Sequence, residues 1–355
     1  MKTLVINSGS SSIKYKLFDM PKETLISKGS IEHIGEKGSA FCDHYSGLKT
    51  ILEKFDLVQA VGHRVVHGAE KFKRPVIVDN KVIRGIRECC DIAPLHNPAN
   101  LSGILACKKL LPGVKQVAVF DTAFHQSIPD YAYIYGLPYE YYRKMQIRKY
   151  GFHGTSHEYV AAEAARILKR PPGKLKLISC HLGNGCSITA IDKGRSIDTS
   201  MGFTPLEGLV MGTRCGDVDP ALVTYIMSRR NIDVRQMERI LNKESGLKGI
   251  SGVSNDMRSL EAAAASGNKR ARLAIDIFIY RIRKYIGSYL SVLGGLDALI
   301  FTAGIGENQS DVRRDVCRGL FRYFERKPRV LVIPTNEELM IARQTCRLIS
   351  PGACK

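Results

Sequence analysis

The chain has 355 residues, of which 44% are hydrophobic and 25% are charged. This composition excludes a disordered chain and leaves enough length for two domains, each with its own hydrophobic core. The formal net charge of +19 is spread along the sequence, without a basic tail or an aromatic-basic motif. It therefore indicates anionic ligands in general, and no nucleic-acid partner is expected.

The sequence shows no run of about 18 apolar residues, so no membrane span is expected. Its first residues enter a strand directly and do not form a signal-peptide pattern, which favours a cytoplasmic protein. The ten cysteines contain no CxxC pair. In a reducing compartment we expect most of them to act as small buried hydrophobic residues.

The first informative feature is a pair of strands joined by an unusual turn. Leu4–Ile6 is predicted as a buried strand, and Ile13–Phe18 alternates as a second one. The linker Ser8–Ser12 is a glycine with four hydroxyl residues, flanked by Asn7 and Lys14. Such a loop suits a phosphate or a hydrated metal ion, and the alternative is a solvated serine turn.

A similar unit recurs at residues 175–191, where an apolar strand enters the polar turn His181–Ser187 and leaves as an alternating strand. Duplicated units point to a repeated architecture. We therefore predict two similar α/β domains, each opening with such a hairpin, with the two turns facing one cleft.

Further elements follow from apolar periodicity. Val117–Asp121 is predicted as a buried strand, and the tyrosine-rich stretch from Tyr131 to Tyr150 has no regular period. Asp217–Leu241 and Ala262–Leu293 are predicted as helices, the second with an apolar stripe at helical spacing.

The C-terminal part is predicted to contain two more strands. The segment "ALIFTAGIGEN" is interpreted as a buried strand that ends in a glycine turn. The segment "RVLVIPTNEEL" is interpreted as a strand leading into a short helix, capped by Thr335 or Asn336 and with acidic residues in its first turn.

Two pairs of histidines lie four residues apart, His63 with His67 and His153 with His157. On a helix this spacing could bind zinc, but neither pair has the glutamate of the usual motif, and a regular helix is doubtful in both. Buried structural roles are expected for His63, His67 and His157.

The common nucleotide-binding motifs are absent, since there is neither GxxxxGK[ST] nor a complete GxGxxG. ATP would have to bind through several short loops. The candidates are residues Ser8–Ser12, His181–Gly185, 254–258 and Gly304–Asn308. Each loop alone is a weak signal, because glycine turns are common.

The acidic candidates for a magnesium site or a base are Asp19, Asp121, Asp198, Asp256 and Glu337. Asp121 ends a buried strand, which favours a position at the edge of a cleft. Arg64, Arg214 and Arg258 lie in short polar segments where they could reach an anionic ligand. For any one of these arginines the alternative is a surface salt bridge.

Ten segments together resemble the acetate kinases, in the same order along the chain and from Met1 to about Ser350. They are "VINSGSSSIKYKLFD", "GHRVVHG", "APLHNPAN", "FDTAFHQSIP", "YGFHGTSHEYV", "HLGNGCSITAI", "DTSMGFTPLEGLVMGTRCGDVDP", "SGVSNDMR", "FTAGIGEN" and "PTNEEL". The resemblance implies an α/β fold of duplicated actin-like ATPase (ribonuclease H-like) domains with a nucleotide cleft between them. It implies an acyl-substrate and metal domain of residues 1–125 plus 339–355, and a nucleotide-binding domain of residues 126–338.

The implied reaction is reversible, in-line phosphoryl transfer from ATP to acetate, which yields acetyl phosphate and ADP. It would depend on Mg²⁺, with Mn²⁺ as a substitute. A homodimer is also implied, with the second domain as its interface.

The resemblance also implies roles for individual residues. Asn7 and Glu337 would serve the metal, and Asp121, His153 and Arg214 the catalysis, where Asp121 is better interpreted as a metal orienter than as a base because the acceptor carboxylate is already ionised. Arg64, Val66, Leu95, Phe152 and Pro205 would bind the acyl substrate. The residues implied for ATP are Lys14, His181, Leu182, Gly183, Asn184, Gly185, Asp256, Met257, Arg258, Gly304, Ile305, Gly306, Glu307 and Asn308.

The sequence departs from the family pattern in three places. Ala69 stands where a second glycine is expected, and the segment between Asp19 and His63 is short. Only 28 residues separate Asn308 from Glu337, where the family carries a further excursion. The rival interpretations are a kinase for propionate and a non-catalytic relative that binds ATP or nucleic acid.

Overall fold

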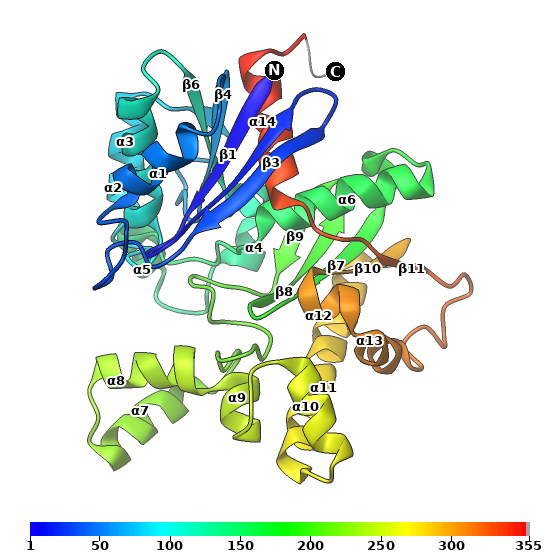
Figure 1. The fold of residues 1–355 in the computed structure, drawn as a ribbon. Helices are drawn as coiled ribbons and strands as arrows, with labels where there is room; N and C mark the ends of the chain where they lie inside the picture. Colours follow the sequence, from blue (N-terminus) through cyan, green and yellow to red (C-terminus); the bar gives the residue numbers. More distant parts are fainter. Residues whose placement is uncertain (353–355) are drawn as a thin grey trace. The chain divides into compact units, whose positions relative to one another are not determined.

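Figure 1 shows the fold in a computed structural model, which describes residues 1–352. The chain divides into two compact α/β units. The first comprises Met1–Gln126, Gly154–Tyr159 and the segment from Asn336 onward, and the second comprises Ser127–His153 and Val160–Thr335. Compared with the expected segments, residues 154–159 group with the first unit, and the return to that unit begins at Asn336 rather than at 339.

The first unit is built on one mixed sheet. Its strands are β1 (Lys2–Ser8), β2 (Ile13–Asp19), β3 (Thr24–Ile31), β4 (Ala60–Val65), β5 (Val76–Ile77) and β6 (Lys115–Phe120). They lie in the order β3-β2-β1-β4-β6-β5. The first three form an antiparallel meander, whereas β4 and β6 continue the sheet parallel to β1.

The second unit repeats this path. Its strands are β7 (Lys176–Leu182), β8 (Cys186–Asp192), β9 (Arg195–Thr199), β10 (Ala298–Thr302) and β11 (Arg329–Val332). The order β9-β8-β7-β10-β11 combines an antiparallel meander with two added parallel strands, as β3-β2-β1-β4-β6 does in the first unit. The duplication predicted from the two hairpins is therefore confirmed.

Helices cover both faces of the first sheet. They are α1 (His44–Leu52), α2 (Asn80–Glu88), α3 (Asn97–Leu110) and α14 (Glu337–Ile349). Successive side chains of a strand point to opposite faces: in β1, Leu4 and Ile6 pack in a core with α1 and α3, while Val5 packs in a core with α14. Gly62 permits the close approach of α14, because a Cβ there would lie 2.7 Å from the Ile341 side chain.

The second unit is richer in helices. They are α4 (Asp130–Tyr133), α5 (Tyr139–Met145), α7 (Pro220–Arg230), α8 (Val234–Arg239), α9 (Gly246–Ser251), α10 (Met257–Ala265), α11 (Lys269–Leu293), α12 (Ala303–Asn308) and α13 (Ser310–Cys317), and α6 (Gly154–Leu168) begins in the first unit and continues into the second. The buried stripe of α11 packs on β7 and β8, as its periodicity predicts.

The two predicted long helices are each broken. In the stretch Asp217–Leu241, α7 ends at Asn231, whose backbone is left-handed, and α8 starts anew from the capping side chain of Asp233. In the stretch Ala262–Leu293, Gly267 has a positive φ, and Asn268 caps the start of α11. Apolar periodicity continued through both breaks, but capping residues ended the helices.

The C-terminal elements were predicted with one error. The residues after β10 form the short helix α12 rather than a glycine turn, because the carboxylate of Glu307 accepts a hydrogen bond from the Ala303 N–H at 2.8 Å. Strand β11 and helix α14 are confirmed. Asn336 caps α14 by accepting from the Leu339 N–H, and Glu337 and Glu338 lie in its first turn.

The histidine pairs do not form helical metal sites. His63 lies in β4, fully buried, and its Nε2 lies 2.8 Å from Gln116 Oε1. Burial lowers the pKa of His63 to about 4, so the ring is neutral near pH 7. His157 does lie in a helix, α6, contrary to the doubt about a regular helix there, but His153 precedes it with a left-handed backbone.

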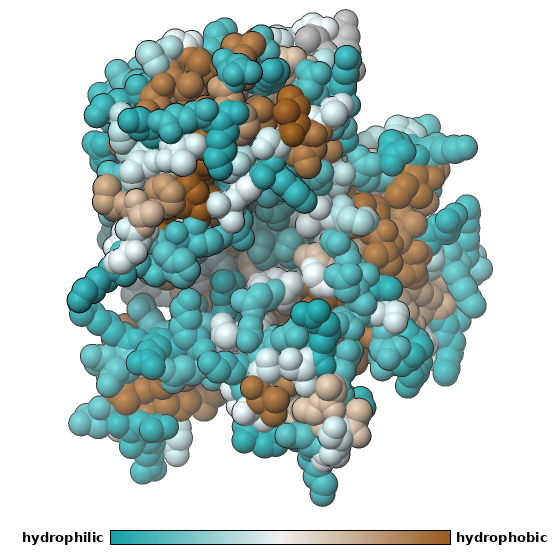
Figure 2. Space-filling view, viewed as in Figure 1, coloured by the Kyte–Doolittle hydropathy of each residue, from teal (hydrophilic) through white to brown (hydrophobic). Residues whose placement is uncertain are grey.

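Among residues 1–352 no group of three or more His, Cys, Asp or Glu side chains is arranged to hold a metal ion. None of the helices described in this range is long and apolar enough to cross a membrane. Hydrophilic residues cover most of the face drawn in Figure 2, and the hydrophobic ones form separate patches.

Candidate functional site

In the first unit, charged and amide side chains collect where the parallel strands end. Asn7 lies near the end of β1, Arg64 near the end of β4, and Asp121 directly follows β6. Because the carboxyl ends of parallel strands meet at one edge of a sheet, residues far apart in sequence become neighbours there. Glu337 joins them as the first residue of α14.

The centre of this cluster is an ion pair between Arg64 and Asp121. Arg64 Nε donates to both carboxylate oxygens of Asp121 at 3.1 and 3.0 Å, and Nη2 donates to Oδ2 at 2.6 Å. The Asp121 side chain is 2% exposed, whereas that of Arg64 is 22% exposed. Thr155 adds a third donor, its hydroxyl lying 3.2 Å from Asp121 Oδ1. This set of donors holds Asp121 as an oriented carboxylate.

Arg64 also contacts the two residues expected at the metal. Its Nη1 lies 3.5 Å from Asn7 Oδ1, and its Nε lies 4.0 Å from Glu337 Oε2. Burial disfavours the charge of Arg64, but Asp121 and Glu337 outweigh it and raise the arginine's pKa. Burial raises the pKa of Glu337 to about 7, with Arg64 opposing the shift and Asp121 adding to it. Glu337 would therefore gain from a nearby cation.

Lys16 fixes the start of the helix that carries Glu337. Its Nζ donates to Glu338 Oε2 at 2.9 Å and to Asn336 Oδ1 at 3.4 Å. Because Asn336 and Glu338 flank Glu337 on both sides, these contacts set the position of that carboxylate. Sequence reasoning missed Lys16, since its partners lie more than 300 residues away.

The small-residue turn opens onto this edge. Lys14 pairs with Asn7 across the hairpin and is exposed. Inside the turn the Gly9 N–H donates to Ser12 O at 2.8 Å. Asn100 from α3 donates to Ser8 O at 2.7 Å, and its own oxygen accepts from the Val66 N–H at 3.0 Å. Asn100 therefore ties the ends of β1 and β4 together.

In the second unit, two histidines and an arginine gather around Gly185. The ring of His153 stacks on that of His181 with their centroids 4.2 Å apart, and His153 Nδ1 lies 2.9 Å from Ser187 Oγ. A Cβ on Gly185 would lie 3.3 Å from Arg214 Nη1 and 3.5 Å from the His153 ring. Glycine at this position therefore lets the guanidinium and the imidazole lie near each other.

Arg214 is half-buried on the loop after Gly208. Its Nη1 donates to Pro205 O at 3.2 Å and lies 3.6 Å from Met211 Sδ. Burial lowers the pKa of Arg214, which no carboxylate offsets in the way that Asp121 does for Arg64. The guanidinium nevertheless stays charged near neutral pH.

A cavity of ≈ 340 Å³ lies at the ends of β7, β10 and α10 in the second unit. Its lining includes eight of the residues expected at ATP, which are Gly183, Asn184, Asp256, Met257, Arg258, Gly304, Ile305 and Asn308. Asn255, which lies inside the predicted loop 254–258, and Gln309, which was not predicted, complete the lining. Gln309 directly follows the predicted loop Gly304–Asn308, so that prediction ended one residue too early.

The other residues expected at ATP have different positions. Glu307 does not line the cavity, and its Oε1 accepts from the Ala303 and Thr335 N–H groups at 2.8 and 3.0 Å, which fixes the turn after β10. His181 and Leu182 end β7, Gly185 lies in the turn between β7 and β8, and Gly306 lies in α12. Lys14 belongs to the first unit.

The residues expected at the acyl group are divided between the units. Val66 and Leu95 belong to the first unit, where Leu95 is 73% exposed. Phe152 and Pro205 belong to the second, where Phe152 is buried and Pro205 contacts Arg214 through its carbonyl.

The structure shows the surroundings of two of the departures from the family pattern. Ala69 has a φ of 46°, a left-handed conformation that glycine adopts without steric cost, which explains why glycine is expected there. The short segment after Asn308 still contains α13, and β11 still pairs in parallel with β10. Shortening therefore leaves this part of the sheet complete.

The sequence matches the acetokinase family over residues 2–325. It is 50% identical to the acetate kinase of Halothermothrix orenii, in an alignment that covers 98% of this chain and 100% of the relative. That alignment runs over 397 positions, more than the chain's 355 residues, so the chain lacks residues that this relative has.

Two solved structures are similar over nearly their whole length. The Porphyromonas gingivalis acetate kinase has a TM-score of 0.95 at 42% identity, with 98% of this chain and 100% of that one covered. A propionate kinase from Francisella tularensis has a TM-score of 0.91 at 42% identity, with 97% and 98% covered. A ROK family protein from Streptococcus pneumoniae, 13% identical with a TM-score of 0.50 and 99% of each chain covered, shares the fold alone. The fold is the duplicated actin-like ATPase fold.

The Arg64–Asp121 pair generates a test of stability. Arg64→Ala should lower the free energy of unfolding by about 3 kcal/mol, because it leaves a buried carboxylate without its charge partner. Adding Asp121→Asn should recover much of that loss, since no unpaired charge then remains. Urea unfolding followed by circular dichroism measures both variants. A double variant as unstable as Arg64→Ala would contradict this account of the pair.

Proposed function

The chain belongs to the acetokinase family, and we propose that it transfers a phosphoryl group reversibly between ATP and acetate, which gives ADP and acetyl phosphate. The observation that carries the proposal is the grouping of Asn7, Asp121 and Glu337 around the guanidinium of Arg64 in the first unit. In the second unit, His153 and Arg214 meet around Gly185. Phosphoryl transfer asks for positioned positive charge and metal ligands, and these clusters supply both.

The nucleotide is proposed to occupy the cavity of the second unit. Gly183 and Gly304 let the backbone come close to phosphate oxygens, and Asn184, Asn255 and Asp256 offer polar groups to the rest of the nucleotide. Lys14 is proposed to contact the phosphates. The net charge of +19 would favour the approach of both anionic substrates.

The direct, in-line reaction needs no general base. A carboxylate acceptor is ionised near pH 7, so no proton has to be removed before it attacks phosphorus. Asp121 already accepts hydrogen bonds from Arg64 and Thr155, which suits an orienting role. We assign the stabilisation of charge on the transferred group to Arg214 and His153, and the binding of the acceptor carboxylate to Arg64.

Mg²⁺, or Mn²⁺ in its place, is the cofactor that the donors suit. Asn7 and Glu337 offer oxygen ligands, which these hard cations prefer, and Mg²⁺ commonly takes only one or two protein ligands beside water and phosphate. The raised pKa of Glu337 supports this assignment, because a buried carboxylate beside a divalent cation is stabilised in its ionised form. The ion would neutralise charge on the phosphates.

Propionate is the second candidate acceptor. The propionate kinase of Francisella tularensis is as similar in sequence as the Porphyromonas acetate kinase. One extra methylene changes binding by only about 1–3 kcal/mol in an apolar pocket. We assign contacts with the acyl group to Val66 and Leu95 in the first unit and to Phe152 and Pro205 in the second.

We place the reaction in the cytoplasm. Within residues 1–352, eight cysteines carry free thiols and Cys346 is disulfide-bonded. Several of the free thiols lie in the cores, among them Cys107, Cys180 and Cys186. Burial raises the pKa of Cys107 and Cys186 to about 12, so these thiols are inert packing groups. This use of cysteine suits a reducing compartment.

A coupled assay of ADP formation with acetate, propionate and butyrate tests the proposed function. Turnover should be highest with acetate, fall with propionate and disappear when the divalent cation is chelated. Return of activity on adding Mg²⁺ or Mn²⁺ serves as the control. No turnover with any of the three acids would refute the proposal and favour a non-catalytic ATP-binding protein.

Substitution of Arg214 separates catalysis from binding. A contact that strengthens in the transition state lowers kcat more than it raises KM, so Arg214→Ala should reduce kcat about a hundredfold or more. Arg64→Ala should raise the KM for acetate as well. Lysine should restore little at either site, because it lacks the planar fork.

Arg239 offers a matched control, since it is an exposed arginine on α8 paired only at the surface with Glu244. Arg239→Ala should leave both parameters unchanged. If Arg214→Ala kept a normal kcat and changed only the KM for acetate, its role in stabilising the transferred group would be wrong.

We also propose a homodimer formed through the second unit. Helix α7 has no buried residue, although it carries Leu222 and Tyr225, which are 44% and 58% exposed. Figure 2 shows hydrophobic residues over the region of α7 and α8, and Val234 on α8 is 63% exposed. Sedimentation at micromolar concentration should give a dimer, and Leu222→Asp with Tyr225→Asp should give a monomer. A wild-type monomer would contradict the proposal.

A further inference from the structure

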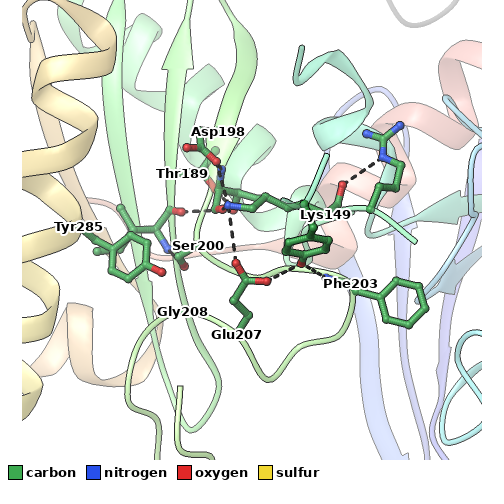
Figure 3. A network of polar contacts seen from close by, with 12 residues as sticks. Lys149, Thr189, Asp198, Ser200, Phe203, Glu207, Gly208 and Tyr285 are labelled. Carbon is green, nitrogen blue, oxygen red and sulfur yellow. Dashed lines mark hydrogen bonds and ion pairs between the residues drawn. The ribbon is translucent and has the colours of Figure 1, made fainter. Parts of the chain in front are cut away.

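A partly buried polar network in the second unit supports the segment that carries Arg214 (Figure 3). Its members are Tyr135, Lys149, Asp198, Glu207, Asp217 and Tyr285. They come from parts of the chain up to 150 residues apart. Only Asp198 was a candidate for the functional site, as a metal ligand or base, and the proposed mechanism uses none of the six.

The loop with Arg214 is closed at its base by its two end residues. The Gly208 N–H donates to Asp217 Oδ1 at 2.8 Å, and the Asp217 N–H donates to Gly208 O at 2.9 Å. The two sides approach so closely that a Cβ on Gly216 would lie 2.5 Å from the Gly208 and Leu209 carbonyl oxygens. Residues 208–217 thus form a closed loop with Arg214 near its tip.

The tip is a tight turn. The Met211 N–H donates to Arg214 O at 3.1 Å, and the Leu247 N–H donates to Met211 O at 2.9 Å. The Arg214 guanidinium points back to the Pro205 carbonyl, so its direction depends on the position of the loop relative to the segment before Gly208. The hydrogen bonds between Gly208 and Asp217 fix that relative position.

Tyr285, which lies outside the loop, contacts Asp217 at its base. It lies on α11, and its hydroxyl donates to Asp217 Oδ2 at 2.7 Å, while Oδ1 of the same carboxylate accepts from Gly208. Both oxygens of Asp217 are therefore engaged, one by the loop and one by the long helix. Burial, followed by the nearby Asp217 carboxylate, raises the pKa of Tyr285, so the hydroxyl remains a proton donor.

The residue before Gly208 is held in the same manner. Glu207 Oε2 accepts from the Tyr135 hydroxyl, and its Oε1 lies 3.9 Å from Lys149 Nζ. Lys149 in turn donates to Asp198 Oδ1 at 3.2 Å. Glu207 and Asp217 thus each fix one end of the loop through a tyrosine.

We propose that Tyr285 is a positioning residue for Arg214, which acts by fixing Asp217 at the base of the loop Gly208–Asp217. The catalytic part of this inference rests on the role proposed for Arg214 in phosphoryl transfer. Removing the Tyr285 hydroxyl frees one oxygen of Asp217 and loosens the closure. The guanidinium then spends less time in its catalytic direction, while the nucleotide cavity keeps all its lining residues.

Tyr289 is the matched control, one helical turn further along α11. Its ring packs edge-to-face against that of Tyr285 at 5.8 Å, and it is 2% exposed. Its hydroxyl is buried but makes no hydrogen bond. Tyr289→Phe therefore removes the same atom from the same helix without touching Asp217.

Hydrogen exchange of the loop and steady-state kinetics test the inference together. In Tyr285→Phe the amides of Gly208 and Asp217 should exchange about fivefold faster, and kcat should fall about fivefold, which corresponds to the net effect of one hydrogen bond. The KM for ATP should not change. Tyr289→Phe should match the wild type in exchange and kcat.

A double-mutant cycle separates positioning from general stability. In an Arg214→Ala background, Tyr285→Phe should lower kcat by less than twofold, because the group that it positions is gone. An undiminished fivefold loss there would overturn the positioning role. Equal exchange and kcat in Tyr285→Phe and Tyr289→Phe would show that the hydrogen bond from Tyr285 to Asp217 does not hold the base of the loop. If exchange is faster in Tyr285→Phe but the wild-type chain phosphorylates no short carboxylate, the proposed function is refuted and the contact of Tyr285 with the loop base stands.

Discussion

The ion pair between Arg64 and Asp121 organises the first unit. A carboxylate that is 2% exposed needs hydrogen-bond donors in place of water, and Arg64 and Thr155 supply them. The backbone of Asp121 takes part as well, because its carbonyl accepts from the Gly154 N–H at the start of α6. The same guanidinium reaches Asn7 and Glu337. One charged contact therefore connects the ends of three strands with the starts of two helices.

The duplication gives both units the same strand path but not the same chemistry. Each sheet presents the carboxyl ends of its central parallel strands at one edge, where side chains from remote parts of the sequence converge. In the first unit that edge carries carboxylates, an amide and Arg64. In the second it carries histidines, Arg214 and a glycine-rich turn. The backbone path thus decides where groups meet, and the residues at the strand ends decide what they can bind.

The two arginines at these edges, Arg64 and Arg214, are held by different kinds of contact. Arg64 is held by carboxylates, which raise its pKa, and it gives Asp121 a fixed orientation. Arg214 has a carbonyl and a sulfur as its neighbours and lies on a loop. An arginine without a carboxylate partner keeps its charge for an incoming anion, but its direction has to come from the loop. The network of Glu207, Asp217 and their tyrosines supplies that direction.

Local patterns in the sequence were sufficient for seven of the described strands, for both hairpins and for a cap of α14 at Thr335 or Asn336, since each depends on residues that are near neighbours in the chain. They did not predict β3, β4, β5 or β9. Asp121 at a strand end and the glycine turns could be recognised for the same reason. Long motifs then placed the chain in its family. The breaks at Asn231 and Gly267 were missed because periodicity was followed further than the capping residues allowed.

Only the tertiary structure decided which of these residues act together. Lys16 meets Asn336 and Glu338 across more than 300 residues, and Tyr285 meets Asp217 across 68. In the sequence Lys16 is one polar residue of an alternating strand, and Tyr285 lies among the basic residues of an amphipathic helix. Nothing local distinguishes them, because their roles come from partners that folding brings near. The sequence by itself thus determined most of the strands and the family, while long-range packing decided how Glu337 and Arg214 are held.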